Sequence, residues 1–145
     1  MTGLQYSEDK DILTGLTLYG KIVSGLGEGK VFTELPWAKE QFLNKVGINP
    51  YPGTLNLKLE NPLALEGLQK LKSRPGIVIA PDNPAFCQGI CYKIMIQGSI
   101  PGAIVIPLVP EYPADKLEII APYNLKERLK VQDGDEITVV VISHH

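Results

Sequence analysis

The segment from Gly25 to Lys30 (GLGEGK) is where this 145-residue chain points most directly to chemistry. Its three glycines would let backbone N–H groups approach an anion closely, and Lys30 adds a positive charge. The segment is not a Walker A loop, because Lys30 is followed by Val31 rather than Ser or Thr. It is not a G-x-G-x-x-G motif either, because its last position is Lys30. The residues alone leave two interpretations open, a phosphate-binding loop and a flexible hairpin connection.

Thr54 and Asn56 form a second pattern, within the sequence PGTLNL. Strand alternation would place both side chains on one face, roughly 7 Å apart at Cα. Hydroxyl and amide oxygens are ligands that Mg²⁺ accepts alongside water and substrate phosphates. Such an ion would bridge the phosphates of a nucleotide and offset their charge during transfer. The alternative is that both residues lie on a solvated strand face.

Glu118 and the residues that follow it form a third pattern, LEIIAPYNLK. A carboxylate between apolar residues could accept a hydrogen bond from a polar ligand, and a helix starting at Asn124 could direct free N–H groups toward that ligand. The alternative is a strand followed by a surface helix that Asn124 caps.

These residues must be positioned by a mostly β fold with a few short helices. Apolar alternation and turn residues predict strands at 16–23, 31–35, 54–59, 77–79, 86–97, 103–108, 117–120 and 137–142. Helices are predicted from Pro36 to Gly47, from Pro62 to Lys72 and briefly after Asn124. Turns are predicted at Gly98, Pro101 and Gly102 and at 133–135. Many short strands without regular β-helix-β alternation predict a barrel rather than a doubly wound sheet.

The bulk composition narrows the class of protein. The length suits one domain, which we expect at 14–145 behind an N-terminal arm at 1–13. The net charge of −2 predicts neither a nucleic acid nor a membrane surface as partner. No apolar run reaches the roughly 20 residues of a membrane helix, and the N-terminus lacks a secretory pattern, so we expect a cytoplasmic protein.

The two cysteines, Cys87 and Cys91, are expected as buried or half-buried thiols in a strand, in a reducing compartment. Structural zinc needs four ligands. The only histidines that could join the two thiols are His144 and His145 at the end of the chain, and we assign them no role. We therefore do not expect the two cysteines to form a zinc site.

Taken together and in this order, the sequences SGLGEGK, PYPGTLNL and LEIIAP with its following Leu-Lys resemble the archaeal-type CTP-dependent riboflavin kinases. The resemblance covers about residues 17–142, and the Asp133-Gly134-Asp135 turn also agrees with it. It implies a single-domain cradle-loop β-barrel and a reaction that transfers the γ-phosphoryl of CTP to the ribityl hydroxyl of riboflavin, giving FMN and CDP.

The resemblance also implies roles for individual residues. The magnesium ligands would be Thr54 and Asn56, and the flavin would contact Glu118. Contacts to the CTP nucleotide would come from Gly25, Leu26, Gly27, Glu28, Gly29, Lys30, Tyr123, Asn124, Leu125 and Lys126. We assign no general base; Glu118 is the nearest candidate, and its expected role is substrate orientation.

The chain departs from the family pattern at Pro110, where the family has a threonine that contacts the flavin phosphate. Proline has neither a hydroxyl nor an N–H, and Glu111 or Tyr112 would take that space. Two alternatives therefore stand beside riboflavin phosphorylation: a kinase for a different small alcohol, and a non-enzymatic nucleotide-binding barrel.

Overall fold

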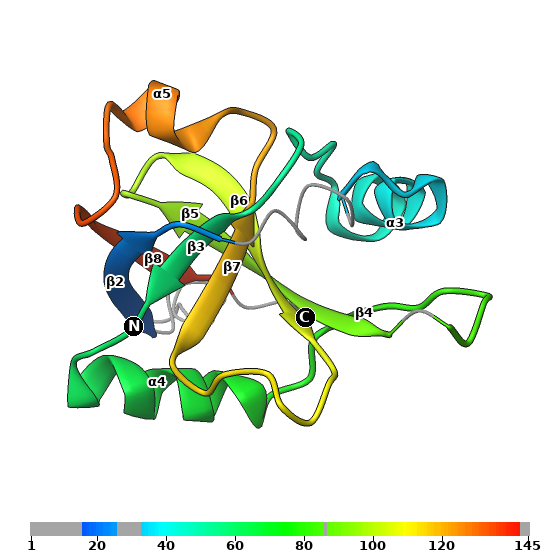
Figure 1. Ribbon diagram of the computed structural model, residues 1–145, viewed down its shortest axis with the longest axis horizontal. Coiled ribbons are helices and arrows are strands. Elements are labelled where there is room, and N and C mark those ends of the chain that lie inside the picture. The colour runs from blue at the N-terminus through cyan, green and yellow to red at the C-terminus, as the bar shows by residue number, and fades with distance from the viewer. Residues whose placement is uncertain (1–15, 26–32, 86, 143–145) are drawn as a thin grey trace, which may run out of the picture.

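Six antiparallel strands form a closed barrel in the computed structural model, which describes residues 16–25, 33–85 and 87–142 (Figure 1). The strands are β2 (Thr17–Val23), β3 (Leu55–Lys58), β5 (Gly89–Ile96), β6 (Ile100–Pro107), β7 (Lys116–Ile120) and β8 (Glu136–Val141). Their order is β5-β6-β7-β3-β2-β8, and pairing of β5 with β8 closes the ring. The short strand β4 (Ile77–Ile79) pairs with the first part of β5. The predicted mostly β barrel is confirmed.

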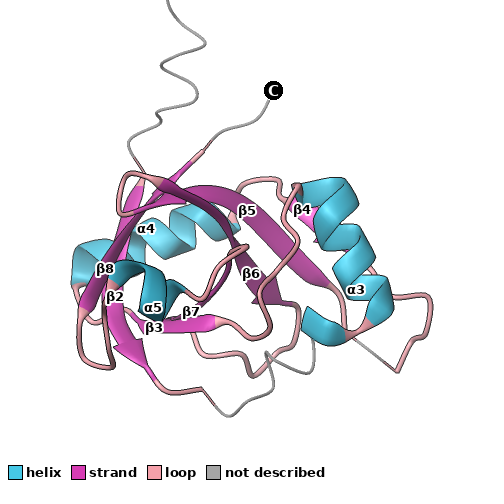
Figure 2. Ribbon diagram, turned by 90° about the horizontal axis from the view of Figure 1, so that it is seen from above, coloured by secondary structure: helices cyan, strands magenta, loops and turns pink. Residues whose placement is uncertain are grey.

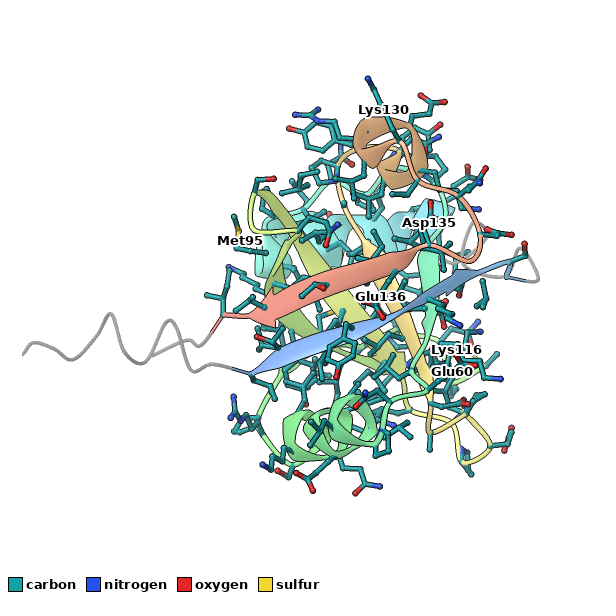
Figure 3. All side chains as sticks on the ribbon, turned by 90° about the vertical axis from the view of Figure 1, so that its left-hand side faces the viewer. Glu60, Met95, Lys116, Lys130, Asp135 and Glu136 are labelled. Atoms are coloured by element: carbon teal, nitrogen blue, oxygen red, sulfur yellow. The ribbon has the colours of Figure 1, made fainter. Side chains whose placement is uncertain are left out.

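The interior of the barrel is filled by one face of each strand. Leu55 and Leu57 point inward from β3, as the alternation predicts, and both belong to the main apolar core. The two ends are closed by helices α4 (Pro62–Lys72) and α5 (Leu125–Leu129), which lie below and above the barrel in Figure 1. Figure 3 shows the same arrangement from the side, with Lys130 at the end of α5.

Helix α4 has the predicted bounds, for identifiable reasons. The Asn61 side chain accepts a hydrogen bond from Leu63 N at 2.8 Å, and Pro62 occupies the first helical position. Gly67 lies against Leu18 of β2, where a Cβ would be only 2.8 Å from Leu18 Cδ2. Leu68 is fully buried in the main core, which contributes about 1.5–3 kcal/mol to stability.

Helix α3 (Pro36–Gln41) continues into the π-helical turn η1 (Phe42–Val46), and together they pack against the outside of the barrel (Figure 2). A second apolar cluster forms there, where Phe42 meets residues such as Val105 of β6 and Ile120 of β7. Gly47 ends the helical segment with a φ of 81°, as predicted. The outer face of the barrel is therefore partly covered next to β7.

Two local predictions are wrong. Thr33 and Glu34 are helical rather than extended. Pro101 and Gly102 lie inside β6, because the turn is formed by residues 97–99. Gly102 is needed for close packing rather than for a turn, since a Cβ there would lie 2.8 Å from the Ile120 carbonyl oxygen of β7.

The cysteine prediction is half correct. Cys91 is buried in β5, but Cys87 is exposed and precedes that strand, which begins at Gly89.

None of the helices in the described residues has the length and apolarity needed to cross a membrane.

Candidate active site

Glu118 lies at the centre of a polar cluster on the outer face of β7. Its neighbours Leu117 and Ile119 are buried inside the barrel, so strand alternation directs Glu118 outward. Its carboxylate accepts two hydrogen bonds, from Thr54 Oγ1 to Oε1 at 3.0 Å and from Tyr112 Oη to Oε2 at 2.7 Å. The fold therefore unites side chains from the start of β3, from β7 and from the loop between β6 and β7.

Asn56 lies directly opposite Glu118 in the antiparallel β3–β7 pair and is only 9% exposed. Its Nδ2 donates to the Thr54 carbonyl oxygen at 3.3 Å, which leaves Oδ1 as the atom of this side chain that could bind a cation. Gly25 packs against the same amide, since a Cβ at Gly25 would overlap Nδ2. The start of the glycine-rich segment thus lies against Asn56.

The donor atoms of this cluster suit Mg²⁺. The Thr54 hydroxyl and the Asn56 amide both offer hard oxygen ligands. Glu118 accepts a hydrogen bond from that hydroxyl, and carboxylates commonly hold metal ligands in this way. Because Thr54 donates its proton to Glu118, the lone pairs of Oγ1 remain available. Across residues 16–25, 33–85 and 87–142, no three His, Cys, Asp or Glu side chains gather as a possible metal site.

Thr54 is positioned by the turn that precedes β3. Gly53 has a φ of 101°, a conformation that glycine adopts without strain, and its N–H donates to the buried Thr33 Oγ1 at 2.9 Å. Two residues earlier, Tyr51 N donates to the Ala121 carbonyl oxygen at 2.8 Å. The first bond attaches the turn to Thr33, and the second attaches it to the residue after β7, so the second and third sequence patterns lie side by side.

Asp133 connects the start of the glycine-rich segment to α5. Lys126 Nζ donates to Oδ1 at 2.8 Å, and Ser24 Oγ donates to Oδ2. These two hydrogen bonds, the one from Lys126 first, lower the pKa of Asp133 below its ordinary value. The turn is also bonded to β2, because Gly134 N donates to the Ile22 carbonyl oxygen at 2.8 Å. The sequence predicts this turn but does not reveal that Asp133 joins two predicted nucleotide-binding segments.

Helix α5 begins at the predicted cap. The Asn124 side chain accepts a hydrogen bond from Glu127 N at 3.3 Å. Tyr123 is 39% exposed, and the Arg128 guanidinium lies 4.0 Å from the centroid of its ring. Leu125 is buried in the barrel core, so only its backbone could meet a ligand. Of the four residues predicted to contact the nucleotide here, Tyr123 could thus offer its side chain, whereas Leu125 could offer only its backbone.

Five residues predicted to bind the nucleotide lie outside the described part of the chain: Leu26, Gly27, Glu28, Gly29 and Lys30. The predicted N-terminal arm at 1–13 also lies outside it. Both assignments stay predictions.

Pro110 occupies a tight turn between β6 and β7. Tyr112 N donates to the Val109 carbonyl oxygen at 3.2 Å, which makes residues 109–112 a β-turn with Pro110 at its second position, a place where the fixed φ of proline is favoured. The turn directs Tyr112 toward Glu118. Burial, followed by the hydrogen bond to Glu118, raises the pKa of Tyr112. Sequence reasoning named Tyr112, as an alternative to Glu111, for the space of the family's threonine, but it did not predict the hydrogen bond to Glu118.

A closed antiparallel barrel with this polar cluster on its outer face defines a small β-barrel protein with a candidate site for a polar ligand. Comparison with known families narrows the class. The family model CTP-dep_RFKase, described as "Domain of unknown function DUF120", matches residues 22–141. The chain belongs to this family, the CTP-dependent riboflavin kinases.

Individual relatives carry the name riboflavin kinase. One from Methanosarcina barkeri is 41% identical over 138 residues, covering 92% of this chain and 59% of the relative. One from Saccharolobus solfataricus is 37% identical over 133 residues, covering 89% and 75%. One from Sulfurisphaera tokodaii is 36% identical over 129 residues, covering 87% and 95%. The chain thus spans little more than half of some relatives and nearly all of another.

Proposed function

We propose that this protein is a magnesium-dependent kinase that transfers the γ-phosphoryl of CTP to the primary ribityl hydroxyl of riboflavin, giving FMN and CDP. The observation that carries the proposal is the cluster of Thr54, Asn56 and Glu118 with Gly25 against it, on the outer face of β3 and β7. The family match over residues 22–141 supports the choice of substrates.

In this reaction the ribityl oxygen forms a bond to the γ-phosphorus, and the bond from that phosphorus to the β–γ bridging oxygen breaks. The hydroxyl proton is released. Catalysis of this kind depends on positioning and on stabilising charge, which is where the protein contributes. Mg²⁺, when bound, would neutralise charge on the phosphates, and Thr54 and Asn56 would hold it.

Glu118 would orient the acceptor. Both of its carboxylate oxygens already accept hydrogen bonds, from Thr54 and Tyr112, an arrangement that suits a fixed acceptor of hydrogen bonds better than a mobile base. We therefore assign Glu118 to binding of the riboflavin part and no residue to proton abstraction.

The nucleotide would lie on the Gly25 side of the cluster. Asp133 accepts hydrogen bonds from both Ser24 and Lys126, which connects the start of the glycine-rich segment to the start of α5. Backbone N–H groups of the loop, together with Lys30, would then bind the phosphates.

Pro110 favours a second candidate, a kinase for another small alcohol. The turn at Pro110 gives the acceptor end a shape and donor set of its own, while the cluster around Asn56 still suits a nucleotide and its metal. This candidate differs from the first only in the acceptor.

The test is to incubate the purified chain with Mg²⁺, riboflavin and either CTP or ATP, and to separate FMN from riboflavin by chromatography with fluorescence detection. We expect FMN with CTP, less or none with ATP, and none after chelation of the metal. CTP binding in calorimetry without riboflavin binding would instead support the second candidate. A folded chain that makes no FMN with any nucleotide contradicts the proposal, and nucleotide binding without transfer to any alcohol would indicate a non-enzymatic barrel.

A further inference from the structure

The carboxylate of Glu118 is held from two sides. An ionised carboxylate has about four acceptor positions, and the hydroxyls of Thr54 and Tyr112 occupy one on each oxygen. The remaining positions are available to N–H or O–H groups of a ligand. Because two separate elements hold the carboxylate, its direction is set before any ligand arrives.

Two interactions hold the Tyr112 side chain, one at its hydroxyl and one at its ring. Its hydroxyl donates to Glu118 at 2.7 Å, and the Lys116 ammonium lies 5.6 Å from the centroid of its ring. The side chain is half-buried, which strengthens the hydrogen bond by excluding water. Its raised pKa keeps the hydroxyl protonated and therefore a donor at neutral pH. The Pro110 turn fixes the backbone from which it projects.

We infer that Tyr112 is a positioning residue for the acceptor alcohol: it aligns the Glu118 carboxylate with the hydrogen-bond donors of that alcohol. In this chain the turn of residues 109–112 supplies the acceptor end with the Tyr112 hydroxyl. The inference rests on the proposed function and deepens it, because it names a residue that determines acceptor affinity.

The contacts of Tyr112 separate its role in acceptor binding from binding of the nucleotide. Tyr112 reaches the cluster through Glu118, whereas Ser24 and Lys126 are joined through Asp133 on the other side. Loss of the Tyr112 hydroxyl should therefore weaken binding of the acceptor and leave the KM for CTP nearly unchanged.

The experiment compares Y112F, E118Q and the double variant with the wild type, using steady-state FMN formation. We expect Y112F to raise the KM for riboflavin about tenfold, the size that fits one lost hydrogen bond to a charged group, with little change in kcat. Since Tyr112 acts through Glu118, the double variant should be no worse than E118Q alone.

Y92F is the matched control. Tyr92 also donates a part-buried hydrogen bond, to the Arg74 carbonyl oxygen at 2.9 Å, but its side chain belongs to the interior core. This variant should keep the riboflavin KM of the wild type. If Y112F fails to fold by thermal melting, Pro110→Gly tests the same point, because loosening the turn should raise the riboflavin KM while the Tyr112 hydroxyl is still present.

The outcomes distinguish the two claims. An active wild type together with a Y112F variant of unchanged riboflavin KM overturns only this inference. Equal increases in the KM values for riboflavin and CTP, or strictly additive losses in the double variant, overturn it as well. A wild type that forms no FMN overturns the proposed function, and the role of Tyr112 with it.

Discussion

Gly25 and Asn56 are in direct contact: a Cβ at position 25 would overlap Nδ2 of Asn56 and lie 3.1 Å from its Cγ. The contact joins the end of β2 to the outer face of β3, where Val23 and Asn56 are paired. Any side chain at position 25 would therefore force the Asn56 amide to move.

The first prediction concerns this contact. Gly25→Ala should displace the Asn56 amide and lower kcat/KM for CTP by about 100-fold, because a small misplacement of a positioning group has effects of that size. Gly89→Ala is the matched control, since a Cβ there would meet its nearest neighbours at 3.6 Å, an ordinary contact distance. Steady-state kinetics at varied CTP would measure kcat/KM for both variants. Equal values for the two variants would argue against the assigned role of Asn56.

The second prediction concerns the hydroxyl of Thr54. Thr54→Val removes both the proposed magnesium ligand and the hydrogen bond to Glu118, whereas Thr54→Ser retains a hydroxyl. We expect the valine variant to need more Mg²⁺ for half-maximal rate and to lose about 100-fold in activity, and the serine variant to stay within about tenfold of wild type. Magnesium titrations of FMN formation measure both. A valine variant with a normal magnesium requirement would remove Thr54 from the metal site.

The third prediction concerns Asp133 and pH. Its folded-state pKa is lowered by the Lys126 and Ser24 hydrogen bonds, so these bonds stabilise the fold above the ordinary aspartate pKa and cease to do so as the pH falls through the lowered value. Asp133→Asn should therefore melt below wild type at about pH 6, and the difference should shrink as the pH falls below the ordinary aspartate pKa.

Glu66→Gln serves as control for Asp133→Asn. It removes one partner of an exposed ion pair with Lys70 on α4, at the other end of the barrel. The change should alter neither the melting temperature nor the KM for CTP, because a single exposed i,i+4 pair contributes little, whereas Asp133 also accepts a hydrogen bond from Ser24. Asp133→Asn should in addition raise the KM for CTP. A KM for CTP equal to that of Glu66→Gln would show that the Asp133 connection does not serve the nucleotide.

The fourth prediction concerns the two thiols. Cys87 is exposed, whereas burial raises the pKa of Cys91 to about 12. Since the thiolate is the reactive form, a disulfide reagent at about pH 8 should modify one thiol per folded chain and two after denaturation. Mass spectrometry should place the first label on Cys87. Rapid labelling of both thiols in the folded chain would contradict the burial of Cys91.

Much of the local structure follows from the sequence. Helix α4 has its predicted bounds because Asn61 and Pro62 define its start locally, and Gly47 ends η1 because glycine adopts a positive φ there. Alternation correctly directs Thr54 and Asn56 to one face of β3, because neighbouring strand residues point to opposite sides. The order of the three motifs was sufficient to indicate the family.

Tertiary structure alone decided what these residues contact. A glycine is needed at position 102 of β6 because the Ile120 carbonyl oxygen passes close to it, a neighbour 18 positions away that no local pattern reveals. Likewise Glu118 meets Thr54 across a strand pair, Tyr112 meets Glu118 through the Pro110 turn, and Asp133 meets Ser24 from 109 positions away. Spacing along the chain predicts which face a side chain takes, but closure of the barrel determines which distant groups share that face. The candidate site is thus encoded as residue types in the sequence and assembled only by the pairing of β2, β3, β6 and β7.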